Sequence, residues 1–185
     1  MAVMTGKDWR TDFGIADRDP PYFFGEKATL DATSRPVPQA HAMRRAFDSM
    51  QLDGILLLQN SLAVYFKEVA KIQPQQMRSL QRRFWNQGLS PVLVVIDPQD
   101  VYIYSGLTPP PDDEVDANHG HQCVQTLSRV TEAAELRHFV LSIESGEFFR
   151  RHAKAFDPQQ RVDRRLLRHL KTTREKLAEV SSTDS

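Results

Sequence analysis

The chain has 185 residues, enough for one domain with a hydrophobic core and short for two. Hydrophobic residues make up 40% and charged residues 26%, which is ordinary for a globular protein. Lys plus Arg and Asp plus Glu both number 24, so net charge favours neither a nucleic acid nor a membrane as partner. Only local clusters of charged residues can therefore indicate a charged partner.

Cysteine content and hydropathy bear on the compartment. Cys123 is the single cysteine, which excludes an intramolecular disulfide and is typical of a reducing compartment. Residues 1–12 contain no apolar run of the kind an export signal needs, and the longest apolar runs are far too short for a membrane span. We expect a cytoplasmic protein without a membrane segment.

Residues 1–38 show no clear periodicity and contain two proline-rich turns, which predicts an irregular N-terminal arm. The arm nevertheless carries five aromatic residues, more than solvated tails usually do. These are Trp9, Phe13, Tyr22, Phe23 and Phe24. We therefore expect the arm to pack against the rest of the chain.

Residues 39–108 alternate helical and strand patterns, which predicts a mixed-sheet core. Apolar residues at helical spacing predict two helices, over residues 39–50 and 75–87. Short apolar runs predict four strands, over residues 52–58, 62–69, 92–96 and 101–104.

The order of these elements predicts the topology. Strand 62–69, helix 75–87 and strand 92–96 form a β–α–β unit, whose strands are parallel and whose crossover is right-handed in nearly all cases. Hairpins on either side widen the sheet. The expected class is α/β (α+β), a mixed sheet with a β-hairpin and a right-handed βαβ core.

The last third of the chain has a different pattern. Residues 109–120 are rich in proline and acid and predict an exposed acidic loop. Residues 121–180 predict a helical C-terminal part of the same domain, with apolar residues at helical spacing and a break at Gly146. Its first helical face consists of Val124, Leu127 and Val130, and a later helix is predicted over residues 158–177.

Two short motifs are interpreted as structural. Asp19-Pro20-Pro21-Tyr22 matches the tetrapeptide with which amino-methylating enzymes hold an extruded base, but no buried strand precedes it and no glycine-rich turn for a methyl donor is found. His119, His121 and Cys123 alternate as potential metal ligands, but no second ligand cluster accompanies them. We predict no metal site from them.

Asp53, Lys67 and Glu68 form the most informative constellation. Metal-dependent nucleases place an acid at the start of one strand, and on the next strand an acid, one spacer and a lysine, to hold Mg²⁺ and polarise water. The predicted hairpin brings Asp53 near Lys67, but Tyr65 stands where the second acid is needed. Glu68 adjoins the lysine and should face the other side of the sheet. The pattern predicts a vestigial site; a hairpin with ordinary charged ends fits equally.

A basic segment lies between Arg150 and Lys176, where ten Lys and Arg against three acids give a net charge of +7. Its cations at helical spacing form a stripe that could follow phosphates. The stripe consists of Arg161, Arg164, Arg165, Arg168 and Lys171. A solvated face or an acidic protein partner fits the same charges.

Several segments together resemble the N-terminal accessory region of restriction-modification-type adenine-specific DNA methyltransferases of bacterial defence systems. They are residues 64–69, 84–96, 101–106, 147–149, 156–158, 161–164 and 166–167. The resemblance covers about residues 40–175. It implies a restriction-endonuclease-like fold that precedes a methyltransferase domain absent from this chain.

The resemblance implies a non-catalytic module of a restriction-modification or phage-defence system. Its expected partners are DNA, a methyltransferase or another defence protein, and it implies no cofactor. One alternative is an Mg²⁺-dependent nuclease using the altered site. Another is a structural or regulatory protein-interaction domain. The oligomeric state is left open.

Overall fold

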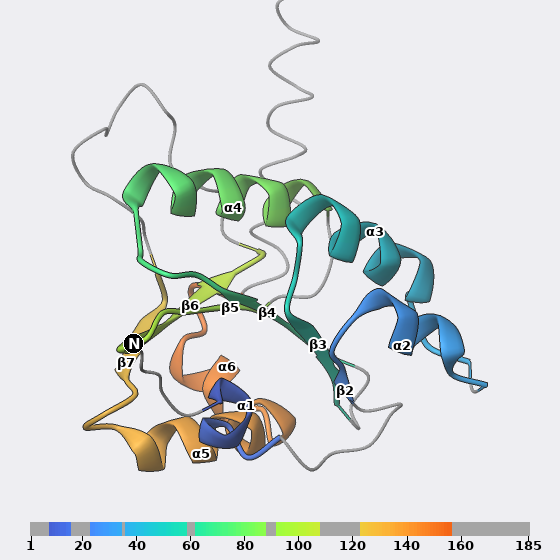
Figure 1. The fold of residues 1–185 in the computed structure, drawn as a ribbon. Helices are drawn as coiled ribbons and strands as arrows, with labels where there is room; N and C mark the ends of the chain where they lie inside the picture. Colours follow the sequence, from blue (N-terminus) through green and yellow to red (C-terminus); the bar gives the residue numbers. More distant parts are fainter. Residues whose placement is uncertain are drawn as a thin grey trace, which may run out of the picture.

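The computed structural model describes residues 8–15, 23–34, 36–58, 62–87, 92–107 and 123–156. These residues form one mixed six-stranded sheet with helices on both faces (Figure 1). The elements are, in chain order, α1 (Trp9–Asp12), β2 (Phe23–Phe24), α2 (Lys27–Ala32), α3 (Ala40–Met50), β3 (Gly54–Leu57), β4 (Ala63–Glu68), α4 (Pro74–Gln87), β5 (Val92–Ile96), β6 (Asp100–Ser105), β7 (Gln125–Ser128), α5 (Ala133–Glu144) and α6 (Glu147–Arg151).

The strands lie in the sheet in the order in which they occur along the chain, from β2 to β7. Strands β4 and β5 are parallel, with Phe66 opposite Val94, while the other neighbouring pairs are antiparallel. Helix α4 connects the two parallel strands, as a crossover between parallel neighbours requires. The predicted hairpin, β–α–β unit and second hairpin are therefore confirmed at the level of pairing and direction.

Helices α2, α3 and α4 cover one face of the sheet (Figure 1). The apolar positions of α3 and α4 recur every three or four residues, so each helix turns one buried stripe toward the strands. Tyr65 of β4 packs edge-on against Phe84 of α4, with ring centroids 5.6 Å apart. This face of β4 is therefore sealed by aromatic packing.

Helices α1, α5 and α6 cover the opposite face (Figure 1). The ring of Trp9 in α1 stacks on Phe66 of β4 at a centroid distance of 4.9 Å. The ring centroid of Phe13 lies 5.4 Å from that of Phe66 and 5.8 Å from that of Phe139 in α5. The N-terminal segment is thus inserted between the sheet and α5, and the expectation that its aromatic residues pack is confirmed for the described ones.

Two sequence predictions were wrong. The segment 1–38 is not irregular throughout, because it contains α1, the edge strand β2 and α2. The spacing of Val124, Leu127 and Val130 does not mark a helix: residues 125–128 are β7, which pairs with β6. Only Leu127 of these three is fully buried, and Val130 is 78% exposed, so their spacing of three was coincidental.

The C-terminal helices follow the predicted pattern more closely. Leu136, Phe139, Val140 and Ile143 form the buried stripe of α5. Gly146 separates α5 from α6 in a left-handed conformation, with φ of 81°, which glycine adopts without strain. The predicted acidic loop and the helix over 158–177 lie outside the described residues. No helix in the part of the chain that the structure describes has the length and apolar character to cross a membrane.

The close packing of β2 on β3 yields a stability prediction. A Cβ atom on Gly54 would lie 2.6 Å from the ring of Phe23, which is buried beside Trp9. We expect Gly54→Ala to lower the free energy of unfolding by about 1–3 kcal/mol, because the ring must move within a packed core. Urea denaturation measures this change. Gly25→Ala is the matched control, since its Cβ would make only ordinary contacts; an equal loss in both variants would contradict the prediction.

Candidate functional site

The open end of the β3–β4 hairpin brings together the three residues of the nuclease-like constellation. The register pairs Gly54 with Phe66, so Asp53 lies beside Lys67 at the point where the hairpin meets the carboxyl end of β4. A hydrogen bond from the Asp53 N–H to the Phe66 carbonyl oxygen, at 2.9 Å, continues this pairing. The predicted proximity of Asp53 and Lys67 therefore follows from the hairpin itself.

The polar atoms of these residues bond to the backbone. An Asp53 carboxylate oxygen accepts the N–H of Glu68 at 2.6 Å. The Lys67 ammonium donates to the carbonyl oxygen of Gln51 at 2.8 Å, directly after the C-terminus of α3. A cation at this position interacts favourably with the helix dipole. Asp53 and Lys67 thus join β4 to β3 and to α3.

Tyr65 occupies the position at which a nuclease would carry its second acid. Its side chain is fully buried under α4, and this burial raises the pKa of the phenol well above its ordinary value. On the same strand Val64 and Phe66 belong to the core of the opposite face. Because side chains alternate along a strand, Glu68 is directed to that opposite side, away from Lys67.

The arrangement does not fit a nuclease-type Mg²⁺ centre. Such a centre needs two carboxylates that converge on one face, and here the second position holds a buried phenol. Within the described ranges, no group of three or more His, Cys, Asp or Glu side chains could hold a metal ion. Chemically, the hairpin end can anchor backbone, and it presents two exposed carboxylates, Asp53 beside the partly buried Lys67 and Glu68 on the other side of the sheet.

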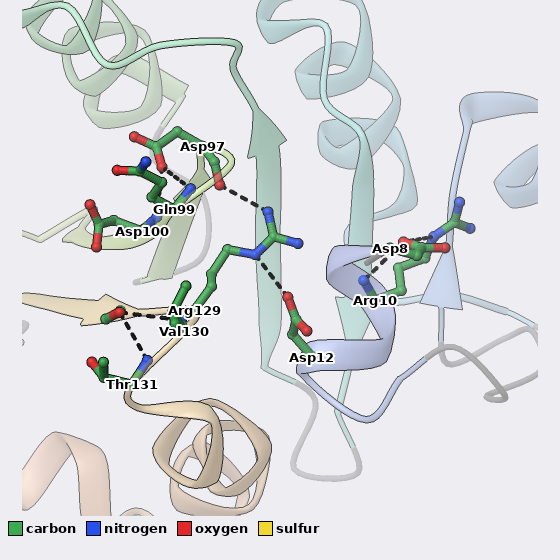
Figure 2. A network of polar contacts seen from close by, with 10 residues as sticks. Asp8, Arg10, Asp12, Asp97, Gln99, Asp100, Arg129, Val130 and Thr131 are labelled. Atoms are coloured by element: carbon green, nitrogen blue, oxygen red, sulfur yellow. Dashed lines mark hydrogen bonds and ion pairs between the residues drawn. The ribbon is translucent and has the colours of Figure 1, made fainter. Parts of the chain in front are cut away.

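A second polar cluster surrounds Arg129 (Figure 2). The Arg129 guanidinium donates to the carboxylate of Asp12 at 2.8 Å and to the carbonyl oxygen of Asp97 at 2.9 Å. The side chains of Arg129 and Asp12 are each 11% exposed, so this ion pair is largely buried. It connects α1 to the β5–β6 turn and to the end of β7.

The Asp97 carboxylate organises the β5–β6 turn. One of its oxygens accepts the backbone N–H groups of Gln99 and Asp100, at 2.8 and 2.6 Å. Burial raises the pKa of the Asp100 carboxyl, and the nearby charges of Asp97 and Glu132 raise it further. The Asp97 carboxylate is thus bound into the turn and the Asp12 carboxylate into the ion pair, and we assign the cluster a structural role.

Sequence patterns did not identify the Arg129 cluster, because Asp12 and Arg129 are 117 positions apart. The only local signal was Asp97-Pro98-Gln99-Asp100, which is typical of a type I turn.

The basic stripe Arg161, Arg164, Arg165, Arg168 and Lys171 lies outside the described residues, as do His119, His121 and Asp19-Pro20-Pro21-Tyr22. The beginning of the basic segment is described, in and after α6. Arg150, Arg151 and Lys154 are exposed there. Cys123, the remaining potential ligand, lies 3.1 Å from the hydroxyl oxygen of Thr126.

Comparisons of the chain with protein-family models, with curated proteins and with solved structures gave no match.

The buried ion pair yields a second stability prediction. We expect Arg129→Ala to lower the free energy of unfolding by about 2–4 kcal/mol, because the Asp12 carboxylate loses its partner inside the protein. Thermal or urea denaturation measures the loss. Arg44→Ala is the control: the Arg44–Asp31 pair is 43% and 47% exposed, so its loss should cost less than about 1 kcal/mol. Equal costs would show that Arg129 contributes no more than a surface pair.

Proposed function

We propose that this chain is a non-catalytic module of a bacterial restriction-modification or phage-defence system, and that it binds DNA or a partner protein such as a methyltransferase. A restriction-endonuclease-like core and a cytoplasmic location belong to the same proposal. The observation that carries it is the hairpin β3–β4, followed by the parallel β4–α4–β5 crossover with Asp53 and Lys67 at its open end.

Topology and residue pattern support the endonuclease-like part. Metal-dependent nucleases of that class place the first acid near the start of one strand and the lysine on the next strand. Asp53 precedes β3, Lys67 is in β4, and α4 follows. The segments that resemble the methyltransferase accessory region include β4, β5 and β6.

The altered site supports the non-catalytic part. Tyr65 is buried by α4 in place of the acid, and the carboxylate of Asp53 and the ammonium of Lys67 stabilise the backbone around β4. A hairpin whose charges hold its own ends together is suited to a scaffold. Binding must then come from another surface, and the segment of net charge +7 is the best candidate in the sequence.

The DNA-binding branch is tested with the full chain on duplex DNA. We expect retention that weakens as salt rises, because cations that neutralise phosphates release counterions. Arg164→Glu combined with Arg168→Glu should reduce the affinity about tenfold or more at moderate salt. Retention that ignores both salt and this variant would refute DNA contact. Binding to a partner that survives nuclease treatment would support the protein-interaction branch.

The nuclease alternative, which would use Asp53, Lys67 and Glu68, keeps one observation in its favour, the proximity of Asp53 to Lys67. A cleavage assay with Mg²⁺ or Mn²⁺ separates the two functions, and we expect the chain to leave plasmid DNA intact. Metal-dependent cleavage by the wild-type chain that Lys67→Ala abolishes would establish the alternative. Lys67→Ala should also lower the free energy of unfolding by about 1 kcal/mol, because α3 loses its contact at Gln51.

A further inference from the structure

An open hollow of about 440 Å³ lies beside the C-terminal end of α6. It is lined by Val124 and by residues 150–155. The charged residues among these are Arg150, Arg151 and Lys154, and no carboxylate is part of the lining that the structure describes. The hollow is therefore a concave surface with charge of one sign.

The three cations that line the hollow differ in the strength of their hydrogen bonds to the protein. The Arg151 guanidinium donates to the Glu147 carboxylate at 2.6 Å, one turn earlier in α6. The Arg150 guanidinium reaches the carbonyl oxygen of Ser145 at 3.4 Å, which is a weak hydrogen bond. Lys154 is exposed on the following turn. Arg150 and Lys154 are thus the two cations best placed to meet a ligand.

His152 also lines the hollow, and its pKa is affected by the surrounding charges. Burial lowers the pKa of its imidazole, and the nearby charge of Arg151 lowers it further. The ring packs against Phe148 at a centroid distance of 4.7 Å, so its position is set by the core side of α6. The lowered pKa favours the neutral imidazole of His152. The positive charge of the hollow therefore comes from Arg150, Arg151 and Lys154.

We propose that this hollow, which we call the α6 hollow, binds the sugar–phosphate backbone of duplex DNA through Arg150 and Lys154. The inference rests on the proposed function and deepens it, because it places a contact surface on the described part of the chain. A guanidinium offers paired donors to a phosphate, and an ammonium offers a point charge beside it. The sequence after residue 156 continues with seven further Lys and Arg up to Lys176, which favours an extended polyanion over a small anion.

The experiment measures the affinity of the full chain for duplex DNA as a function of salt. Arg150→Gln combined with Lys154→Gln should lower the affinity about fivefold to tenfold at moderate salt, and should reduce the slope of log K against log salt by about 2. Arg150→Glu with Lys154→Glu should lower it further. Unchanged thermal unfolding of each variant verifies that the fold is retained.

Arg45→Glu with Arg83→Glu is the matched control for the glutamate pair. Both residues are exposed, on α3 and α4, and these helices lie on the opposite face of the sheet from α6 (Figure 1). This variant changes the net charge by the same amount and should leave DNA affinity within about twofold of the wild type, because its charges are remote from the α6 hollow.

The outcomes distinguish the two proposals. If the wild-type chain binds DNA and the α6-hollow variants bind as well as the wild type, the inference is wrong while the proposed function stands. If the wild-type chain shows no salt-dependent binding, the DNA branch itself fails. Displacement of the duplex by polyglutamate at equal charge concentration would overturn the assignment to DNA, because it would identify a surface for an acidic protein.

Discussion

Strand β5 is the constraint on which the rest of the structure depends. Each of its five residues is at most 1% exposed, and Val92, Val94 and Ile96 face one helical layer while Leu93 and Val95 face the other. Burying a side chain of this kind contributes roughly 1.5–3 kcal/mol, so neither face of the strand is stable in contact with water. Two helical layers follow from this, α2 to α4 on one side and α1, α5 and α6 on the other (Figure 1).

The two-layer arrangement also determines what the hairpin end can do. Strand β4 lies next to β5 and shares its buried faces, so Tyr65 and Phe66 are both fully enclosed, by different helices. The charged residues of β4, Lys67 and Glu68, stand at its carboxyl end, where the strand is no longer buried. There the lysine bonds to the end of α3 and Asp53 to the backbone of β4. Tyr65, buried against α4, occupies the position that a second metal-binding carboxylate would need. This is the physical basis for proposing a non-catalytic module.

The ion pair of Arg129 and the cations for which we propose a recognition role differ in their exposure to solvent. The largely buried ion pair between Arg129 and Asp12 holds the N-terminal helix on the sheet (Figure 2). The exposed cations of α6 are on the outer side of the layer that this contact secures. Phe148 fixes α6 in the core, so the binding that we propose would require little rearrangement of this helix.

The sequence by itself predicted the parallel β–α–β unit, because the apolar run 92–96 is too short for a helix and favours a strand covered on both faces, and the helical pattern before it sets the crossover. It also determined that Asp53 and Lys67 meet, since a tight hairpin sets its own register. Only the tertiary structure decided that residues 125–128 form an edge strand, because spacing in so short a segment does not distinguish a strand from a helix until β6 is available as its partner. Only the tertiary structure decided the Arg129–Asp12 pair as well: the two residues are 117 positions apart and become partners through folding, and nothing in the sequence around either residue specifies the other.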